Sequence, residues 1–183
     1  MNAILVLCLS SRITSSAMWG YYASNHKGAC LVFDIPVFNL QIRNDILYGS
    51  FDKPHIPFLK VNYTKHRINI PEESFLAQTN EQYINLRECI AIKGKDWEYE
   101  QEYRIDLSDA GIKEGVSVEN GLFFYSTIMH YLSGVVLGMK SELSADYVKR
   151  LLNNDSNISI ERAYIHPTLT EIFCGAFTDS QGI

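Results

Sequence analysis

Short apolar runs separated by polar breaks open the chain. The run 3–9 is apolar throughout and of strand length. It has no basic residue before it and no small-residue cleavage pattern after it, so we interpret it as a buried strand and not as a signal peptide. A helix is predicted over 17–25, with Ser15 or Ser16 as its N-cap. Gly28 is predicted to stop this helix in the left-handed conformation, which glycine adopts without steric cost.

The rest of the chain mixes helix and strand patterns. Pro71 opens a helix predicted over 72–92, because proline suits the first turn of a helix. The segment 134–165 predicts a strand at 134–139, a helix at 141–152 capped by Ser141, and a strand at 158–165. If both strands share a sheet, they are parallel. Further strands are predicted at 29–33, 58–63, 122–125 and 170–174, with a strand or a turn feeding a strand at 97–107 and a loop at 109–120.

These elements predict one α+β domain over residues 1–183, with a mixed central sheet and a few flanking helices. The length suffices for one domain with a sizeable core, and no internal repeat or linker divides the chain. Hydrophobic residues make up 46% and charged residues 20%, which is an ordinary globular composition. No apolar run reaches membrane-spanning length, so we expect no membrane partner.

Charge and cysteine usage limit the function classes. The formal net charge is −5, so most of the surface repels phosphate backbones and general nucleic-acid binding is not expected. The four cysteines lie far apart without a CxxC pair, which predicts buried free thiols in a reducing compartment, the cytoplasm. The five histidines show no metal-ligand spacing, and we assign no metal site.

The densest polar pattern is the sequence WEYEQEYR at residues 97–104. On a strand, its three glutamates and Arg104 would share one face and its aromatic residues the other. On an exposed edge these carboxylates would simply be solvated. In a cleft, their repulsion would raise the pKa of at least one of them, or the group would hold a cation or sugar hydroxyls.

A second pattern places hydroxyl groups at a strand end and aromatic residues on the helix that follows. Ser10 and Ser11 end the first strand, Trp19 and Tyr22 lie on the helix, and His26 comes after it. The turn after the C-terminal end of a strand is a common place for ligands to bind. The alternative is that Trp19 and Tyr22 pack in the core and that His26 has a capping or structural role.

Together these segments resemble a bacterial family catalogued as a domain of unknown function, family 2971. The matching segments are MWxxYAxxHxG at 18–28, WxYExEYR at 97–104, CLSS at 8–11, KVNY at 60–63 and VVLGM at 135–139. Members of that family usually carry an upstream segment with a Tyr-Lys-Tyr strand and an FNDPF motif. Met1 lies just before the CLSS strand, so we expect this chain to be a shortened member of the family, half of a split protein, or the product of an internal start.

More distantly, the pattern is similar to that of ADP-ribosyltransferases, which combine a strand ending in polar residues, an aromatic-bearing helix and a late Glu-x-Glu. Loss of nicotinamide from NAD leaves a ribosyl cation, and a glutamate that grips the ribose hydroxyls stabilises it. The resemblance implies an ADP-ribosyltransferase-like fold with NAD as substrate, Glu102 as the catalytic carboxylate and Glu100 as the residue that orients the acceptor. The candidate NAD-binding residues are Ser10 or Ser11 for the ribose, Trp19 or Tyr22 for the nicotinamide ring, and His26 and Arg104 beside them.

Three functions from different classes remain open at this point. The first is an NAD-using, ADP-ribosyltransferase-like enzyme or toxin in bacterial defence or conflict. The alternative is a non-catalytic sensing or partner-binding domain, whose tyrosines and tryptophans anchor a protein partner or a homo-oligomer. A second alternative is a metal-dependent nuclease or hydrolase that uses Glu98, Glu100 and Glu102, although three acids on one strand face need ligands from elsewhere.

Overall fold

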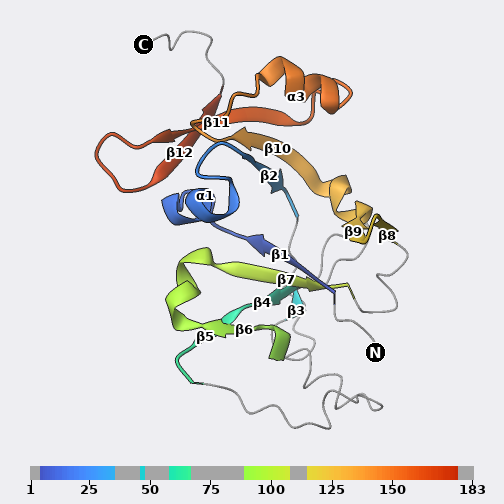
Figure 1. Ribbon diagram of the computed structural model, residues 1–183, viewed down its shortest axis with the longest axis vertical. Helices are drawn as coiled ribbons and strands as arrows, with labels where there is room; N and C mark the ends of the chain where they lie inside the picture. The colour runs from blue at the N-terminus through green and yellow to red at the C-terminus, as the bar shows by residue number, and fades with distance from the viewer. Residues whose placement is uncertain (1–4, 36–45, 48–57, 67–88, 108–114, 177–183) are drawn as a thin grey trace. The chain divides into compact units, whose positions relative to one another are not determined.

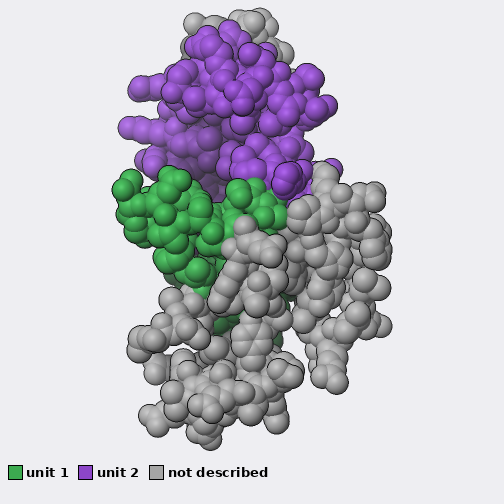
Figure 2. All heavy atoms as spheres, turned by 90° about the vertical axis from the view of Figure 1, so that its right-hand side faces the viewer, with its two compact units in different colours: residues 1–11, 36–127 green, residues 12–35, 128–183 purple. Residues whose placement is uncertain are grey.

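The computed structural model describes residues 5–35, 46–47, 58–66, 89–107 and 115–176 (Figure 1). The chain divides into two compact units, which Figure 2 colours separately. Unit 1 comprises residues 1–11 and 36–127, and unit 2 comprises residues 12–35 and 128–183. Each unit contains a four-stranded sheet, and the helices between the strands confirm the α+β class. The expectation of a single domain stays a prediction.

The four-stranded sheet of unit 1 is antiparallel throughout. Its strands follow the order β1 (Val6–Ser10), β7 (Glu102–Asp106), β4 (Phe58–Lys60) and β3 (Ile46–Leu47). β7 is a central strand because it pairs with both β1 and β4. Its apolar face packs inward through Ile105, which is fully buried, and Phe58 and Val61 are buried in the same unit. The opposite face of β7 carries Glu102 and Arg104, and it holds the candidate site.

Two strand pairs complete the described part of unit 1. β5 (Asn62–Thr64) runs parallel to β6 (Ile92–Gly94), and β8 (Val116–Glu119) forms a hairpin with β9 (Leu122–Tyr125). The hairpin turn is Asn120-Gly121, in which both residues have positive φ, as a tight two-residue hairpin requires. The loop predicted over 109–120 is therefore wrong at β8. The helix predicted over 72–92 lies mostly outside the described residues, and it extends too far, because Ile92 begins β6.

The sheet of unit 2 is mixed. Its strands follow the order β12 (Ile172–Ala176), β11 (Ser159–Ile165), β10 (Leu132–Leu137) and β2 (Ala29–Phe33). β10 and β11 are parallel, as predicted, whereas β2 and β12 are antiparallel to their neighbours. The connection between the parallel strands contains α3 (Ala145–Leu151).

Helices cover both faces of this sheet. Successive residues of β10 point to opposite faces, so Val136 packs with Trp19 of α1 (Ser16–Tyr22), while Val135 and Leu137 pack with Val148 of α3. The N-cap of α1 is Ser15, as predicted, and its hydroxyl accepts a hydrogen bond of 3.4 Å from the amide of Met18. The cap predicted for α3 at Ser141 is wrong. Ser144 caps that helix through a hydrogen bond of 3.2 Å from the amide of Tyr147.

A left-handed turn follows α1. Ser24, Asn25 and His26 all have positive φ, so the stop predicted at Gly28 occurs earlier. Gly28 serves close packing instead, because a Cβ there would lie 3.2 Å from the backbone of Ala23. Gly138, after β10, is needed for the same reason, since a Cβ there would lie 2.1 Å from the carbonyl oxygen of His26. The MWxxYAxxHxG and VVLGM segments thus meet backbone to backbone.

The cysteines agree only in part with the sequence prediction. All four are free thiols. Cys8 is exposed, and the other three are partly buried, so the prediction of buried thiols fails at Cys8. Cys8 belongs to an apolar run of the sequence, but it lies on the polar face of the unit 1 sheet. Its partner on the neighbouring strand is Arg104.

Candidate functional site

The WEYEQEYR segment begins in a 3₁₀ helix, Lys95–Glu100, and continues into β7. Of the two forms predicted for 97–107, a strand or a turn feeding a strand, the structure has the second. Gln101 joins the two elements in the left-handed conformation, and its amide donates to the carbonyl of Glu98 at 3.2 Å. The predicted face of three glutamates is therefore wrong at Glu98, because strand alternation does not extend into the 3₁₀ helix. Glu98 is exposed and pairs with Lys95.

The polar end of β1 holds this turn in place. The hydroxyl of Ser10 donates to the carbonyl of Glu100 at 2.6 Å. Ser11 donates to the carbonyl of Gln101 through its amide at 3.1 Å and through its hydroxyl at 3.2 Å. Both predicted serines therefore lie beside the glutamate segment, where they bind its main chain.

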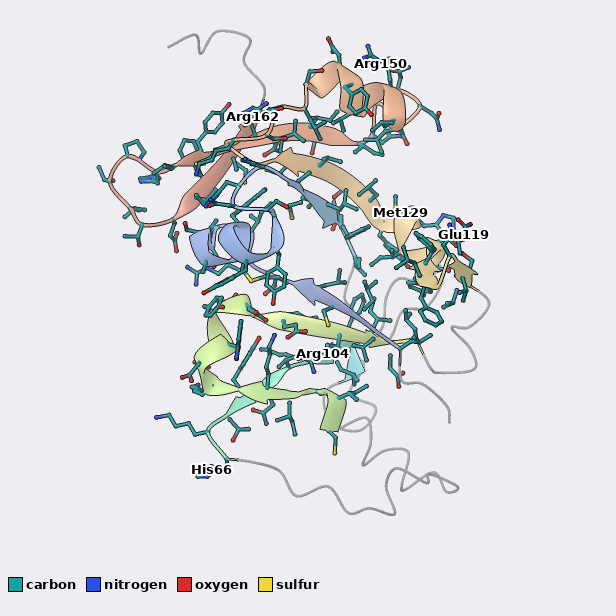
Figure 3. The ribbon with its side chains drawn as sticks, in the orientation of Figure 1. His66, Arg104, Glu119, Met129, Arg150 and Arg162 are labelled. Atoms are coloured by element: carbon teal, nitrogen blue, oxygen red, sulfur yellow. The ribbon has the colours of Figure 1, made fainter. Side chains whose placement is uncertain are left out.

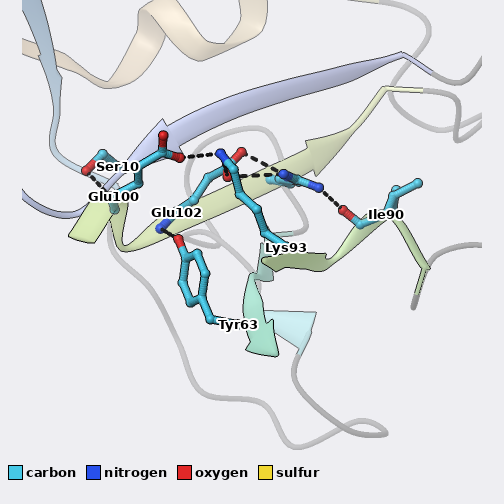
Figure 4. A network of polar contacts seen from close by, with 7 residues as sticks. Ser10, Tyr63, Ile90, Lys93, Glu100 and Glu102 are labelled. Atoms are coloured by element: carbon cyan, nitrogen blue, oxygen red, sulfur yellow. Dashed lines mark hydrogen bonds and ion pairs between the residues drawn. The ribbon is translucent and has the colours of Figure 1, made fainter. Parts of the chain in front are cut away.

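Glu102 lies at the centre of a buried network of charges (Figure 4). Only 5% of the residue is exposed. Its Oε1 accepts from Nε of Arg104 at 2.8 Å, and its Oε2 accepts from Nη2 of Arg104 at 3.1 Å and from Nζ of Lys93 at 3.0 Å. Lys93 also pairs with Glu100, which is 2% exposed. One ammonium therefore bridges two buried carboxylates.

The network keeps Glu102 ionised. Burial raises the pKa of this carboxyl, but hydrogen bonds from Arg104, Cys8 and Lys93 outweigh burial and lower the pKa from 4.5 to about 2. Burial lowers the pKa of Lys93, and its hydrogen bonds to Glu100 and Glu102 outweigh this and raise it. Two cations thus balance two carboxylates. Of the outcomes that we gave for such a cluster in a cleft, a raised carboxylate pKa does not occur at Glu102, and the neighbouring cations are supplied by the chain itself.

Neighbouring strands fix the main chain around Glu102. Its amide donates to the hydroxyl of Tyr63 at 2.8 Å, and its carbonyl accepts from the amide of Val61 at 3.0 Å. Arg104 donates through Nη1 to the carbonyl of Ile90. Two hydrogen bonds therefore connect the KVNY segment to the main chain of Glu102 in β7, and they restrict the movement of this residue.

An exposed aromatic surface lies next to the buried charges. Trp97 is 42% exposed, and Nζ of Lys93 lies 5.2 Å from the centroid of its ring. The ring of Tyr99 is 6.0 Å from that of Trp97, centroid to centroid, and tilted by 35°. The site therefore combines buried carboxylates with an accessible indole, and the ammonium of Lys93 contacts both.

The other predicted NAD-binding residues belong to unit 2. Trp19 is 3% exposed, and its Nε1 donates to the carbonyl of Ile13 at 2.8 Å, so it has the core role that we left open as an alternative. Tyr22 is exposed. Nδ1 of His26 is buried and has no hydrogen-bond partner in the structure as described. The structure brings together Ser10, Ser11, Glu100, Glu102 and Arg104 within unit 1, and Trp19, Tyr22 and His26 lie in unit 2.

Residues 18–105 match the model of a protein family of unknown function, DUF2971. Over this segment the chain is similar to the DUF2971 family. The matched DUF2971 segment contains both aromatic motifs, Lys93 and the two buried carboxylates. Neither the curated proteins nor the solved structures contain a match to the chain.

Three residues of the site were not predicted from the sequence: Lys93, Tyr63 and Cys8. Lys93 could have been suspected, because three glutamates with one arginine need a further positive charge nearby. For Tyr63, the sequence offered only its position in the KVNY segment. For Cys8 it offered no signal, and the contact of Cys8 with the cluster follows from the β1–β7 register. Although the residue as a whole is exposed, partial desolvation of its thiol and a hydrogen bond to Glu102 raise the pKa of Cys8 to about 11.

A metal-binding group and a membrane-spanning helix were also sought among the described residues. There, no three His, Cys, Asp or Glu side chains are grouped so that they could hold a metal ion. No helix among those described is long and apolar enough to cross a membrane.

Proposed function

We propose that this chain is an NAD-using, ADP-ribosyltransferase-like enzyme whose catalytic carboxylate is Glu102, acting in bacterial defence or conflict in the cytoplasm. The observation that carries the proposal is a buried Glu102 that stays ionised, with a pKa of about 2, beside a second buried carboxylate. Stabilising a ribosyl cation requires a carboxylate that is charged at neutral pH and fixed in position. Charged groups are rarely buried unless they are paired, and apolar residues of similar volume would often stabilise a fold as well as a buried ion pair does.

The proposed reaction divides the work between the two glutamates. The bond between the nicotinamide nitrogen and C1′ of the ribose breaks, and its electron pair leaves with nicotinamide. Glu102 accepts a hydrogen bond from a ribose hydroxyl and stabilises the positive charge on the ribosyl group. A nucleophilic atom of the acceptor then attacks C1′ and passes its proton to Glu100.

Substrate binding has to replace one existing contact, because Glu102 already accepts two hydrogen bonds from Arg104, one from Lys93 and one from Cys8. These donors use the acceptor sites of a carboxylate, of which there are about four. Arg104 holds both oxygens in a planar, bidentate arrangement. Lys93 makes a single contact with Glu102 and also contacts Glu100 and the Trp97 ring. Because lysine is a flexible point charge, we expect it to yield its place to the ribose hydroxyl, while Arg104 keeps Glu102 ionised.

Nicotinamide release from NAD, followed by mass spectrometry, tests this function. The protein is assayed alone and with cell lysate as a source of acceptor. Glu102→Gln should abolish release, and Glu98→Gln should leave it unchanged, because Glu98 lies in the same segment but is exposed and pairs with Lys95 at the surface. Circular dichroism establishes that each variant is folded. Glu100→Gln is the second variant if Glu102→Gln does not fold. Absence of release from the wild type, or equal release from a folded Glu102→Gln, would refute the proposal.

An alternative function, self-association, is favoured by the β8–β9 hairpin, where Glu119 is labelled in Figure 3. Val118, Leu122, Phe123 and Phe124 are each at least 45% exposed. Exposed apolar surface of this kind marks interaction sites. Glu119 is the one charged residue of the two strands, so charge repulsion between two copies at this surface is limited to one carboxylate from each. Light scattering after size exclusion should show a dimer that Phe123→Ser dissociates, and a monomer at all concentrations would exclude this alternative.

A further inference from the structure

Trp97 presents an accessible indole beside carboxylates that are almost completely buried. Nζ of Lys93 lies 5.2 Å from the centroid of the indole and 3.0 Å from Oε2 of Glu102, and it also pairs with Glu100. A flat apolar surface and two hydrogen-bond acceptors therefore surround one ammonium group. A molecule that replaces this ammonium meets both surfaces at once.

The indole is held by short-range structure. Trp97 lies on the 3₁₀ helix Lys95–Glu100, and Ser10 anchors the end of that helix through the carbonyl of Glu100. Tyr99, on the same helix, has its ring centroid 6.0 Å from that of Trp97. A positioned aromatic ring loses little conformational freedom when a second ring stacks on it, which favours binding.

The other tryptophan of the chain is unsuited to this role. Trp19 is 3% exposed, packs against Val136 and Ala163, and uses its Nε1 to bind the carbonyl of Ile13. A ring could stack on Trp19 only if the core of unit 2 opened. Trp97 is 42% exposed and needs no such opening.

We propose that Trp97 is the stacking residue of the site and that its ligand is a nucleoside, whose planar base lies on the indole while its ribose hydroxyls reach Glu102. The inference rests on the proposed function for the role of Glu102. Stacking on an aromatic side chain recognises any flat ring, and carboxylates recognise hydroxyl groups. A nucleoside joins these two groups through one glycosidic bond, which matches an indole and a carboxylate that share one neighbouring ammonium.

Fluorescence provides a direct measurement, because the chain contains two tryptophans. In the Trp19→Phe variant, Trp97 is the one remaining tryptophan. Adenosine and nicotinamide mononucleotide should quench its emission to saturation, and ribose 5-phosphate should not. In calorimetry, Trp97→Ala in the otherwise unchanged protein should weaken nucleoside binding by about tenfold, and Trp97→Phe should restore most of it, since base–aromatic stacking energies are of that order. Both Trp97 variants should melt like the wild type because the residue is half-exposed.

The outcomes separate this inference from the proposed enzyme. If nucleosides bind Trp97→Ala as tightly as the wild type, or bind neither, the stacking inference is overturned even when Glu102-dependent nicotinamide release is present. If nucleosides quench Trp97 and need it for binding, but no nicotinamide is released from NAD, the inference stands and the transferase reaction falls. Adenosine and nicotinamide mononucleotide tell which end of NAD the indole prefers.

Discussion

Glu102 should make the free energy of unfolding depend on pH in the acidic range. Its pKa is about 2 in the folded chain, against 4.5 for an unperturbed glutamate. Because the pKa is lowered by folding, the unfolded chain takes up the proton first as the pH falls. The stabilisation is therefore complete above about pH 4.5 and is lost as the pH falls from about 4.5 to about 2.

The difference between the two pKa values of Glu102 corresponds to about 3 kcal/mol of stability at neutral pH. Between about pH 6 and about pH 3, roughly 2 kcal/mol of this is lost. The residue is 5% exposed, so solvent does not screen these interactions as it would at the surface. Glu102→Gln should also destabilise the protein at neutral pH by about 3 kcal/mol, because Lys93 and Arg104 lose a buried counter-charge.

Urea unfolding followed by circular dichroism measures both effects. Wild type, Glu102→Gln and Glu98→Gln are compared at a series of pH values from about 3 to about 7, across the range in which a glutamate titrates. Glu98→Gln should keep the pH dependence of the wild type, because Glu98 is exposed. Glu102→Gln should lose that part of it. If Glu102→Gln shows the same pH dependence as the wild type, Arg104 and Lys93 do not hold Glu102 ionised in the folded chain.

Three further predictions concern unit 2. Gly138→Ala should lower the melting temperature and reduce the free energy of unfolding by about 1–3 kcal/mol, because its Cβ would collide with the carbonyl of His26. The control is Gly20→Ala, whose Cβ would have no atom within 4 Å and which should stabilise α1 by about 1 kcal/mol. Equal melting of the two variants would contradict this. Burial and Lys140 lower the pKa of His26, so stability should fall as the pH drops below about 6.5, and urea unfolding of His26→Gln should lack this fall. Arg162→Lys should cost about 2 kcal/mol in urea unfolding, because the guanidinium donates to three carbonyls of the loop before α3 and an ammonium cannot span them; an unchanged value would show that these bonds do not stabilise the loop.

Continuous apolar runs made parts of the fold predictable from sequence. The strand expected at 29–33 is β2 with the same ends, and the strand expected at 122–125 is β9. The parallel pairing of β10 and β11 followed from the strand–helix–strand order. β8 was missed because glycines flank it and its residues are exposed, so its strand form depends on pairing with β9 across the Asn120-Gly121 turn.

The candidate site was predictable in its residues but not in its geometry. Glu100, Glu102 and Arg104 were identified as one group because they alternate within a short segment. The turn at Gln101 removed Glu98 from this group, and the left-handed conformation of a glutamine is not apparent in sequence. The position of Lys93 between the two glutamates could not be predicted, because it depends on the pairing of β6 with β5. The role of Trp19 was decided by burial, which an amphipathic pattern alone leaves open.

The strand order also determines how the chain is assembled during synthesis. Val6 pairs with Asp106, and Ala29 pairs with Leu137, so the two N-terminal strands leave the ribosome long before their neighbours exist. Until then, their apolar side chains and open edges are available to other nascent chains. The matched segment 18–105, expressed alone, would lack β1 beside β7 and β10 beside β2. Productive folding therefore depends on release of the C-terminal strands, and chaperones that shield early strands should raise the yield of native protein.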